Sequence, residues 1–168
     1  IAFARTPMTL ANVAWDLQTV TGGRFVLGLG SQIRPHVEQR FSMPWDPPVA
    51  RLRELVLGIR AIWHAWETGE RLAFAGEHYT HTRMIPAFDP GPNAFGAPRI
   101  LTAGVGPRMT EVAGEVADGF LVHPVNTRRS LLELTLPALA RGASRAGRDV
   151  ADLEVVCVTI VVTGRTEE

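Results

Sequence analysis

Cysteine is nearly absent from this sequence, since Cys157 is the single one among 168 residues. No intramolecular disulfide can form, so the sequence favours the reducing environment of the cytoplasm. An excess of one charge is absent too, because 17 Lys and Arg residues balance 17 Asp and Glu residues. A neutral chain lacks the basic footprint of a nucleic-acid-binding protein, and we expect no such partner. The longest apolar run, residues 155–162, is far shorter than the roughly 20 residues that span a bilayer, so we expect no membrane partner.

Several common catalytic patterns are missing as well. The sequence contains no C-x-x-C, no H-E-x-x-H and no Ser–His–Asp order, so we predict neither a metal site nor a hydrolase triad. His78 and His81 are three residues apart on an expected strand and should point to opposite faces, which argues against a shared metal. Two other histidines, His36 and His123, follow segments where a ligand could bind, and they are the histidine candidates for a site.

What the sequence does contain is short apolar strands that alternate with amphipathic helices. This alternation predicts an α/β fold with a parallel sheet and right-handed connections. An open doubly wound sheet and a (β/α)8 barrel, which needs about 250 residues, both satisfy the pattern. The expected strands cover residues 1–4, 24–30, 99–103, 120–122 and 153–162, a small hairpin covers 72–82, and the expected helices cover 9–20, 31–41, 47–66, 107–118 and 128–146.

Both ends of the chain have the pattern of buried strands. A buried strand needs a neighbour on each side and cover on each face. Nothing in these 168 residues lies beyond the two end segments to supply that cover. We therefore expect the sequence to be an internal part of a longer domain that continues on both sides.

Two turns that contain glycine follow expected strands and are candidates for ligand binding. The first, T-A-G-V-G-P at residues 102–107, lies where a strand leads into a helix. Glycines let a ligand approach the backbone, and a helix N-terminus offers free N–H groups and a positive dipole, which suits a phosphate. The full G-x-G-x-x-G pattern fails because Met109 stands in place of its third glycine. The second turn, residues 28–31, can line the mouth of a barrel. A plain turn without a ligand is the alternative in both cases.

A series of motifs resembles the luciferase-like monooxygenases and their relatives that depend on coenzyme F-420. The motifs follow the order of that family over nearly the whole chain, and residues 31–45 are similar to one F-420-dependent subgroup in particular. The matching segments are the fourth-strand motif at 21–30, the helix at 53–63, F-A-G-E-H-Y of the hairpin at 74–79, the fifth strand at 98–104, A-G-E-V-A-D-G at 113–119, and the G-R-D turn at 147–149.

The resemblance implies an incomplete (β/α)8 TIM barrel, from about strand 3 to strand 7, that forms one partial domain over residues 1–168. It also implies an oxidoreductase that transfers a hydride between the deazaflavin coenzyme F-420 and an unknown organic substrate. Near residues 1–3 the family often holds a strained non-proline cis peptide. The family positions that contact the cofactor correspond here to Gly30, Ser31, Gly104, Val105, Gly106 and Pro107.

The resemblance leaves several alternatives open. Ser31 stands where some F-420-dependent dehydrogenases have a Glu that accepts a proton, so we do not expect a sugar-phosphate dehydrogenase of that type. In this family the acidic or histidine residue that addresses the cofactor ring lies on the first two strands, outside this chain. An FMN-dependent monooxygenase of the same fold is the first alternative, and an inert fragment that binds nothing is the second. The expected partner is a small-molecule substrate, and a homodimer of the intact parent is compatible with the resemblance.

Overall fold

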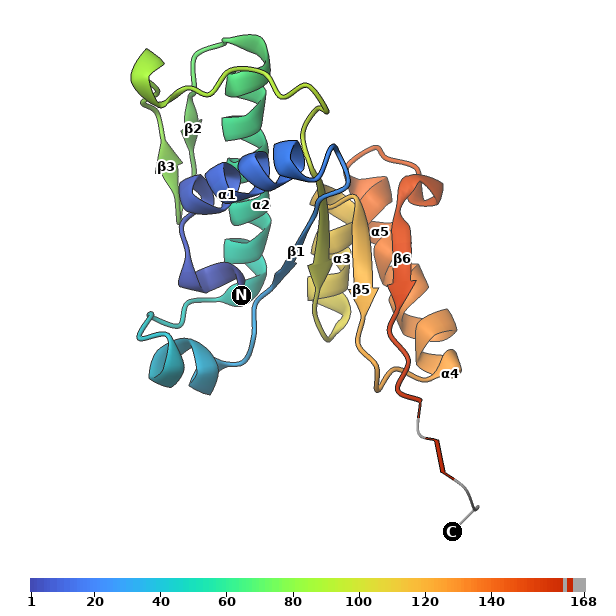
Figure 1. Ribbon diagram of the computed structural model, residues 1–168. Helices are drawn as coiled ribbons and strands as arrows, with labels where there is room; N and C mark the ends of the chain where they lie inside the picture. The colour runs from blue at the N-terminus through green and yellow to red at the C-terminus, as the bar shows by residue number, and fades with distance from the viewer. Residues whose placement is uncertain (162, 165–168) are drawn as a thin grey trace.

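The main feature of the structure, a computed structural model that describes residues 1–161 and 163–164, is a parallel sheet of four strands (Figure 1). The strands lie in the order β1-β4-β5-β6, and each pairs in parallel with the next. Their bounds are Val26–Gly30, Arg99–Ala103, Gly119–Val122 and Glu154–Cys157. Neighbours that follow chain order are typical of a (β/α)8 barrel, whereas a doubly wound sheet reverses its order at a switch point. The prediction of an α/β fold with part of a barrel is therefore confirmed.

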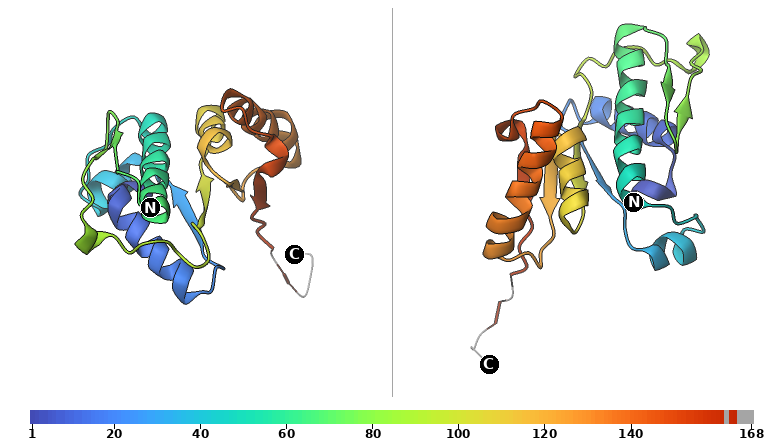
Figure 2. Two further views of the ribbon diagram at one scale, coloured as in Figure 1. Left: turned by 90° about the horizontal axis from the view of Figure 1, so that it is seen from above. Right: turned by 180° about the vertical axis from the view of Figure 1, so that it is seen from behind.

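Helices connect the strands, and α3 and α5 cover one face of the sheet, as the view from behind shows (Figure 2). The helices are α1 (Pro7–Val20), α2 (Pro48–Thr68), α3 (Pro107–Val116), α4 (Arg128–Ser130) and α5 (Leu136–Arg145). Short helical turns are η1 (Ala2–Ala4), η2 (His36–Arg40), η3 (Pro86–Phe88), η4 (Leu131–Thr135) and η5 (Val150–Asp152), of which η2 and η4 are π-helical. The predicted hairpin is formed by β2 (Phe74–Ala75) and β3 (Thr80–His81). Among the described residues, no helix is both long enough and apolar enough to cross a membrane.

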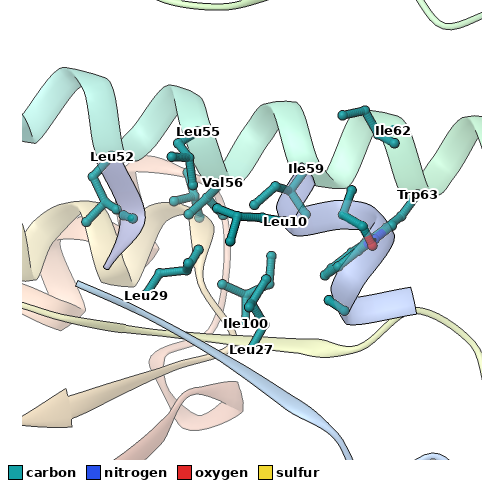
Figure 3. Close-up of a cluster of buried hydrophobic side chains, with 14 of the residues drawn as sticks. Leu10, Leu27, Leu29, Leu52, Leu55, Val56, Ile59, Ile62, Trp63 and Ile100 are labelled. Atoms are coloured by element: carbon teal, nitrogen blue, oxygen red, sulfur yellow. The ribbon is translucent and has the colours of Figure 1, made fainter. Parts of the chain in front are cut away.

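Alternation of side chains gives the sheet two different faces. Leu27 and Leu29 of β1 and Ile100 of β4 are buried against α2, and Figure 3 shows them directed toward the apolar side of that helix. The opposite face, which we call the inner face, carries the intervening residues and is more open, because Val26 is 42% exposed. The residues of the inner face are Val26, Gly28, Gly30, Arg99, Leu101, Ala103, Gly119, Leu121, Glu154 and Val156.

Asp118 joins three strands and a helix at the point where the strands begin. Its carboxylate accepts the backbone N–H of Ile100 at 2.7 Å and the guanidinium of Arg60 in α2 at 2.8 Å. Its own backbone N–H donates to the Ile100 carbonyl, and its carbonyl accepts the N–H of Glu154. One residue of the A-D-G motif therefore links β4, β5, β6 and α2.

Two glycines allow α3 and α5 to pack in close contact. A Cβ atom at Gly114 would overlap the Leu139 carbonyl oxygen, and one at Gly142 would overlap the Glu111 carbonyl oxygen. The Glu111 carboxylate also accepts hydrogen bonds from Arg141 at 2.9 Å and Arg145 at 3.2 Å. These arginines, Arg141 most of all, lower the pKa of the Glu111 carboxyl below its ordinary value.

Three expected elements differ from those observed. Residues 1–4 do not form a strand. Ala2–Ala4 form the 3-10 turn η1, which buries Ala2 and Phe3 against α2, and none of the four residues pairs with β1. No cis peptide bond occurs in the described part of the chain, so the one expected near residues 1–3 is not found. The last strand is shorter than the expected residues 153–162, because β5 ends at Val122 and offers no partner beyond Cys157; residue 162 itself lies outside the described residues.

The two expected helices around the site are also irregular. Residues 34–40 of the expected helix 31–41 are helical, and 36–40 of these form the π turn η2. The expected helix 128–146 is helical without a break from 128 to 145. The predicted irregularity near Pro137, which has no N–H to give to the preceding turn, takes the form of the π turn η4 just before it.

We expect Gly142→Ala to lower the free energy of unfolding by about 1–3 kcal/mol, because the new methyl group would overlap the backbone of α3. An exposed helix position would behave in the opposite way, since Ala is favoured over Gly by about 1 kcal/mol. Urea unfolding of the purified protein measures the difference. Ser144→Ala, two residues further along on the exposed side of α5, should change stability by less than about 0.5 kcal/mol. A Gly142→Ala protein as stable as that control would contradict the close packing.

Candidate functional site

A cleft of about 860 Å³ opens at the C-terminal ends of the strands. Segments that follow β1, β4, β5 and β6 all contribute to its lining. In barrels of this kind, ligands bind at that end of the sheet because the loops after the strands converge there. All six residues predicted to contact a cofactor, Gly30, Ser31, Gly104, Val105, Gly106 and Pro107, line this one cleft.

Small residues form the floor of the cleft at its centre. Gly30 of β1 lies beside Ala103 of β4 in the sheet register, and Ala103 lies beside Leu121 of β5. A Cβ atom at Gly30 would be 3.7 Å from both the Cβ and the carbonyl oxygen of Ala103, so the two backbones lie close together with little side chain above them. The surface over Gly30 and Ala103 has room for a flat ligand, and the larger side chain of Leu121 borders it on the β5 side.

The turn between β4 and α3 uses its two glycines for different purposes. Gly106 precedes α3 with φ +94° and ψ 152°, a conformation that only glycine adopts without strain, and its missing side chain faces open space, with no atom within 4 Å of an added Cβ. Gly104 has a packing role, since a Cβ there would overlap Met109 Cγ and lie 3.1 Å from Met109 Cβ.

The N-terminus of α3 presents free donors to the turn. The first intrahelical bond joins the Thr110 N–H to the Gly106 carbonyl, at 3.2 Å, and no side chain caps the helix. The backbone N–H groups of Arg108 and Met109 precede that bond and have no acceptor within the helix. The turn therefore combines an open glycine position with donors and the positive end of the helix dipole, an arrangement suited to an anion.

Charge along the cleft is entirely positive. Arg34 and Arg108 are the ionised side chains of its described lining, and no carboxylate lines it. The Arg34 guanidinium donates to Glu38 at 3.0 Å, and this hydrogen bond raises the pKa of Arg34. Arg108 is exposed at the first turn of α3, next to the open turn. The lining favours a ligand with a negatively charged group.

The wall opposite α3 comes from the segment between β1 and α2 and from the first turn of α2. Ile33, Trp45 and Val49 line it, and Ile33 is 58% exposed. The segment holds both non-glycine residues with positive φ in the described chain, Gln32 at 59° and Ser42 at 52°. Left-handed positions of this kind are more frequent at functional sites than elsewhere.

The two candidate histidines have different positions. His123 follows β5 directly and lines the cleft, as well as a smaller cavity of about 330 Å³ on the other side of the Gly104–Pro107 turn. Its Nδ1 atom accepts the backbone N–H of Val125 at 3.3 Å. His36 lies outside the lining of both cavities, with its ring bonded to the Gln32 side chain at 3.0 Å.

Sequence reasoning missed several residues of the cleft. The side chains of Ile33, Trp45 and Arg108 line it. Ile33 and Trp45 belong to the stretch 31–45 that resembles an F-420-dependent subgroup, but that resemblance did not single them out as cleft residues. Arg108 could have been found from its place directly after the predicted turn, whereas Trp45 reaches the cleft only through the irregular path of residues 31–47. In the described part of the chain, no group of three or more His, Cys, Asp or Glu residues is placed to hold a metal ion.

Comparison with known proteins gives consistent matches over the whole chain. A family profile described as luciferase-like monooxygenase matches residues 1–168. An uncharacterised protein of Mycobacterium tuberculosis is 56% identical over 98% of this chain and 48% of its own length. The phthiodiolone/phenolphthiodiolone dimycocerosates ketoreductase of M. tuberculosis is 32% identical over 98% of this chain and 42% of its own length. The chain thus spans about half the length of the curated relatives that it matches.

Two solved structures share the fold. An F-420-dependent secondary alcohol dehydrogenase, in complex with an F-420–acetone adduct, superimposes with a TM-score of 0.72 and 20% identity over 90% of this chain and 44% of the other. A monooxygenase from Streptomyces bottropensis superimposes with a TM-score of 0.70 and 25% identity over 92% of this chain and 46% of the other.

The packing role of Gly104 can be separated from ligand binding by a double-mutant cycle. We expect Gly104→Ala to lower the free energy of unfolding by about 1–3 kcal/mol, because Met109 must move. Met109→Ala removes the overlapping Cγ atom, so the double variant should be more stable than the sum of the two losses by about 1 kcal/mol or more. Chemical denaturation of the four proteins tests this, and strictly additive losses would refute the contact.

Proposed function

This chain belongs to the luciferase-like monooxygenase family, and from that premise we propose that it forms about half of a (β/α)8-barrel oxidoreductase that transfers a hydride between coenzyme F-420 and an organic substrate. The barrel continues on both sides of residues 1–168 in this proposal, which agrees with relatives about twice as long. The 168 residues alone hold one wall of the site and are inactive by themselves. The intact parent takes a small-molecule substrate.

The residues of the cleft fit a flat, anionic coenzyme, and this fit carries the proposal. The open position at Gly106 and the N–H groups of Arg108 and Met109 would hold a phosphate group. Gly30 and Ala103 would support the ring, with Ser31 at its edge. The absence of a carboxylate among the described residues of the lining suits a coenzyme with several negative charges.

The choice of F-420 rests on residues 31–45, which resemble an F-420-dependent subgroup. A ketone or the corresponding alcohol is the substrate type that we propose, because a relative of 32% identity is a ketoreductase. The coenzyme supplies the hydride donor or acceptor when bound. The residues of this chain bind its phosphate, orient its ring and exclude water from one side of the cleft with Ile33, Trp45 and Val49.

An FMN-dependent monooxygenase is the second candidate. It is supported by the description of the family and by the fold shared with the Streptomyces bottropensis monooxygenase. FMN also has a phosphate and a flat ring, so the same cleft residues would hold it. The two candidates differ in the reaction with oxygen, which only the monooxygenase needs.

Gly106→Val in the intact parent should weaken coenzyme binding at least tenfold, about 1.4 kcal/mol, because the side chain fills the space that the phosphate needs. Gly91→Val is a matched control, since Gly91 also has a positive φ with no atom within 4 Å of an added Cβ, and it lies outside the cleft. Fluorescence titration with F-420 gives the affinities. Equal binding by the folded Gly106→Val protein and the parent would show that this turn holds no phosphate.

The identity of the coenzyme is tested with the intact parent in parallel titrations with F-420 and FMN. We expect binding of F-420 and, without oxygen, loss of its visible absorbance band when a secondary alcohol is added. FMN binding together with substrate-dependent oxygen uptake would instead support the monooxygenase. Binding of neither coenzyme would favour a protein without this chemistry.

A further inference from the structure

We infer that His123 is a catalytic residue that acts as a neutral hydrogen-bond donor, through Nε2–H, to the substrate oxygen that gains negative charge during hydride transfer. This inference rests on the proposed function. It assigns to the cleft a polar group that recognises a carbonyl or an alcohol, and so it specifies the substrate chemistry further.

The position of His123 follows from the alternation of side chains along β5. Gly119 and Leu121 belong to the inner face, while Phe120 and Val122 are buried toward the helices. His123 is the next residue in the inner-face series, one step beyond the end of the strand. Residues at that place in a barrel point into the active site, and His123 indeed lines the cleft.

A backbone contact determines which nitrogen of the ring can donate. The Val125 N–H donates to Nδ1 at 3.3 Å, so Nδ1 must carry a lone pair in this arrangement. A neutral imidazole has one hydrogen, which is then on Nε2. The Asn126 N–H also donates to the His123 carbonyl at 2.9 Å, and the resulting turn holds the residue in place. Among the described residues, Nε2 has no hydrogen-bond partner, so its N–H is available to a ligand.

The other polar side chains of the cleft are less suited to this role. Ser31 Oγ donates to the Gln32 carbonyl at 3.2 Å, and Arg34 is engaged with Glu38. Arg108 lies beside the turn proposed for the phosphate. His123 lies after β5, one strand away from the Gly30–Ala103 floor, where a substrate could lie beside a flat ring.

The reaction balances as follows for ketone reduction. A bound reduced deazaflavin would supply the hydride that forms the C–H bond at the carbonyl carbon, while the π electron pair of the C=O bond moves to the oxygen. The Nε2–H of His123 donates to this oxygen and stabilises its charge without giving up the proton. Solvent water then protonates the oxygen, and the alcohol leaves; the reverse direction uses the same contact.

The test uses the intact parent and three variants, His123→Ala, His123→Gln and His64→Ala. Removal of one such donor lowers kcat by about 10²–10³-fold in other enzymes, and we expect a loss of that size for His123→Ala. The Gln amide can donate from a similar position, so His123→Gln should recover at least about tenfold of that loss, which a proton-transfer role would not allow. His64 is an exposed histidine of α2, with 61% of its side chain accessible, and its removal should leave kcat unchanged.

Two readouts do not depend on turnover. All variants should bind F-420 with affinities within about twofold of the parent. Nitrogen-15 NMR of the histidine rings, with the His123 signal identified by its loss in His123→Gln, should show the Nε2–H form.

An Nδ1–H form, an unchanged kcat in His123→Ala, or no recovery in His123→Gln would overturn the inference. If the parent binds no F-420 and reduces no ketone, the proposed function fails with it, whereas a working parent with an unaffected His123→Ala variant rejects only the role of His123.

Discussion

The hydrogen bonds of Asp118 hold the sheet in the register on which the cleft depends. Its carboxylate and its peptide groups bind Ile100, Glu154 and Arg60, so β4, β5, β6 and α2 are fixed relative to one another at the start of the strands. Parallel strands that are in register at one end are in register at the other. If the pairing of the strands shifted by one residue, Ala103 and Leu121 would turn away from the inner face. Residues that now pack on the helices would take their places. The hydrogen bonds that determine the geometry of the cleft thus lie at the opposite end of the strands from the cleft itself.

Close packing of the helices complements this arrangement. Gly114 and Gly142 bring α3 against α5, while Gly104 lets Met109 lie under the turn that begins α3. These contacts fix the direction of α3, and therefore the direction of the N–H groups at its N-terminus. A rigid helix end is what a phosphate site requires, because preorganised donors lose little entropy when a ligand binds. Gly104, Gly114 and Gly142 contact no proposed ligand themselves, but they position the backbone N–H groups that would bind the phosphate.

Much of the fold followed from the sequence, because apolar periodicity reports which side of an element is buried. The strands β1, β4 and β5 were predicted within one or two residues, and the turn at residues 104–107 was placed correctly at the end of β4. Residues 1–4 were predicted wrongly because an apolar tetrapeptide satisfies a strand and a buried turn equally well. The π turns were not foreseen, since their local pattern is that of an ordinary helix.

The residues predicted to contact a cofactor were identified through family motifs and lie together in the cleft, whereas Trp45 and Ile33 depend on a loop path that no periodicity encodes. The role of each site residue stays a prediction.

The position of Cys157 has a practical consequence. It is the single thiol of this sequence, it is exposed, and it is followed directly by Val158 in the wall of the cleft. In the strand alternation Cys157 lies on the face opposite Val156, so a maleimide dye attached to it would lie behind the wall of the cleft, on an exposed side chain. Such a reporter would respond to changes in β6 when a colourless ligand binds, which allows compound collections to be screened by fluorescence without turnover.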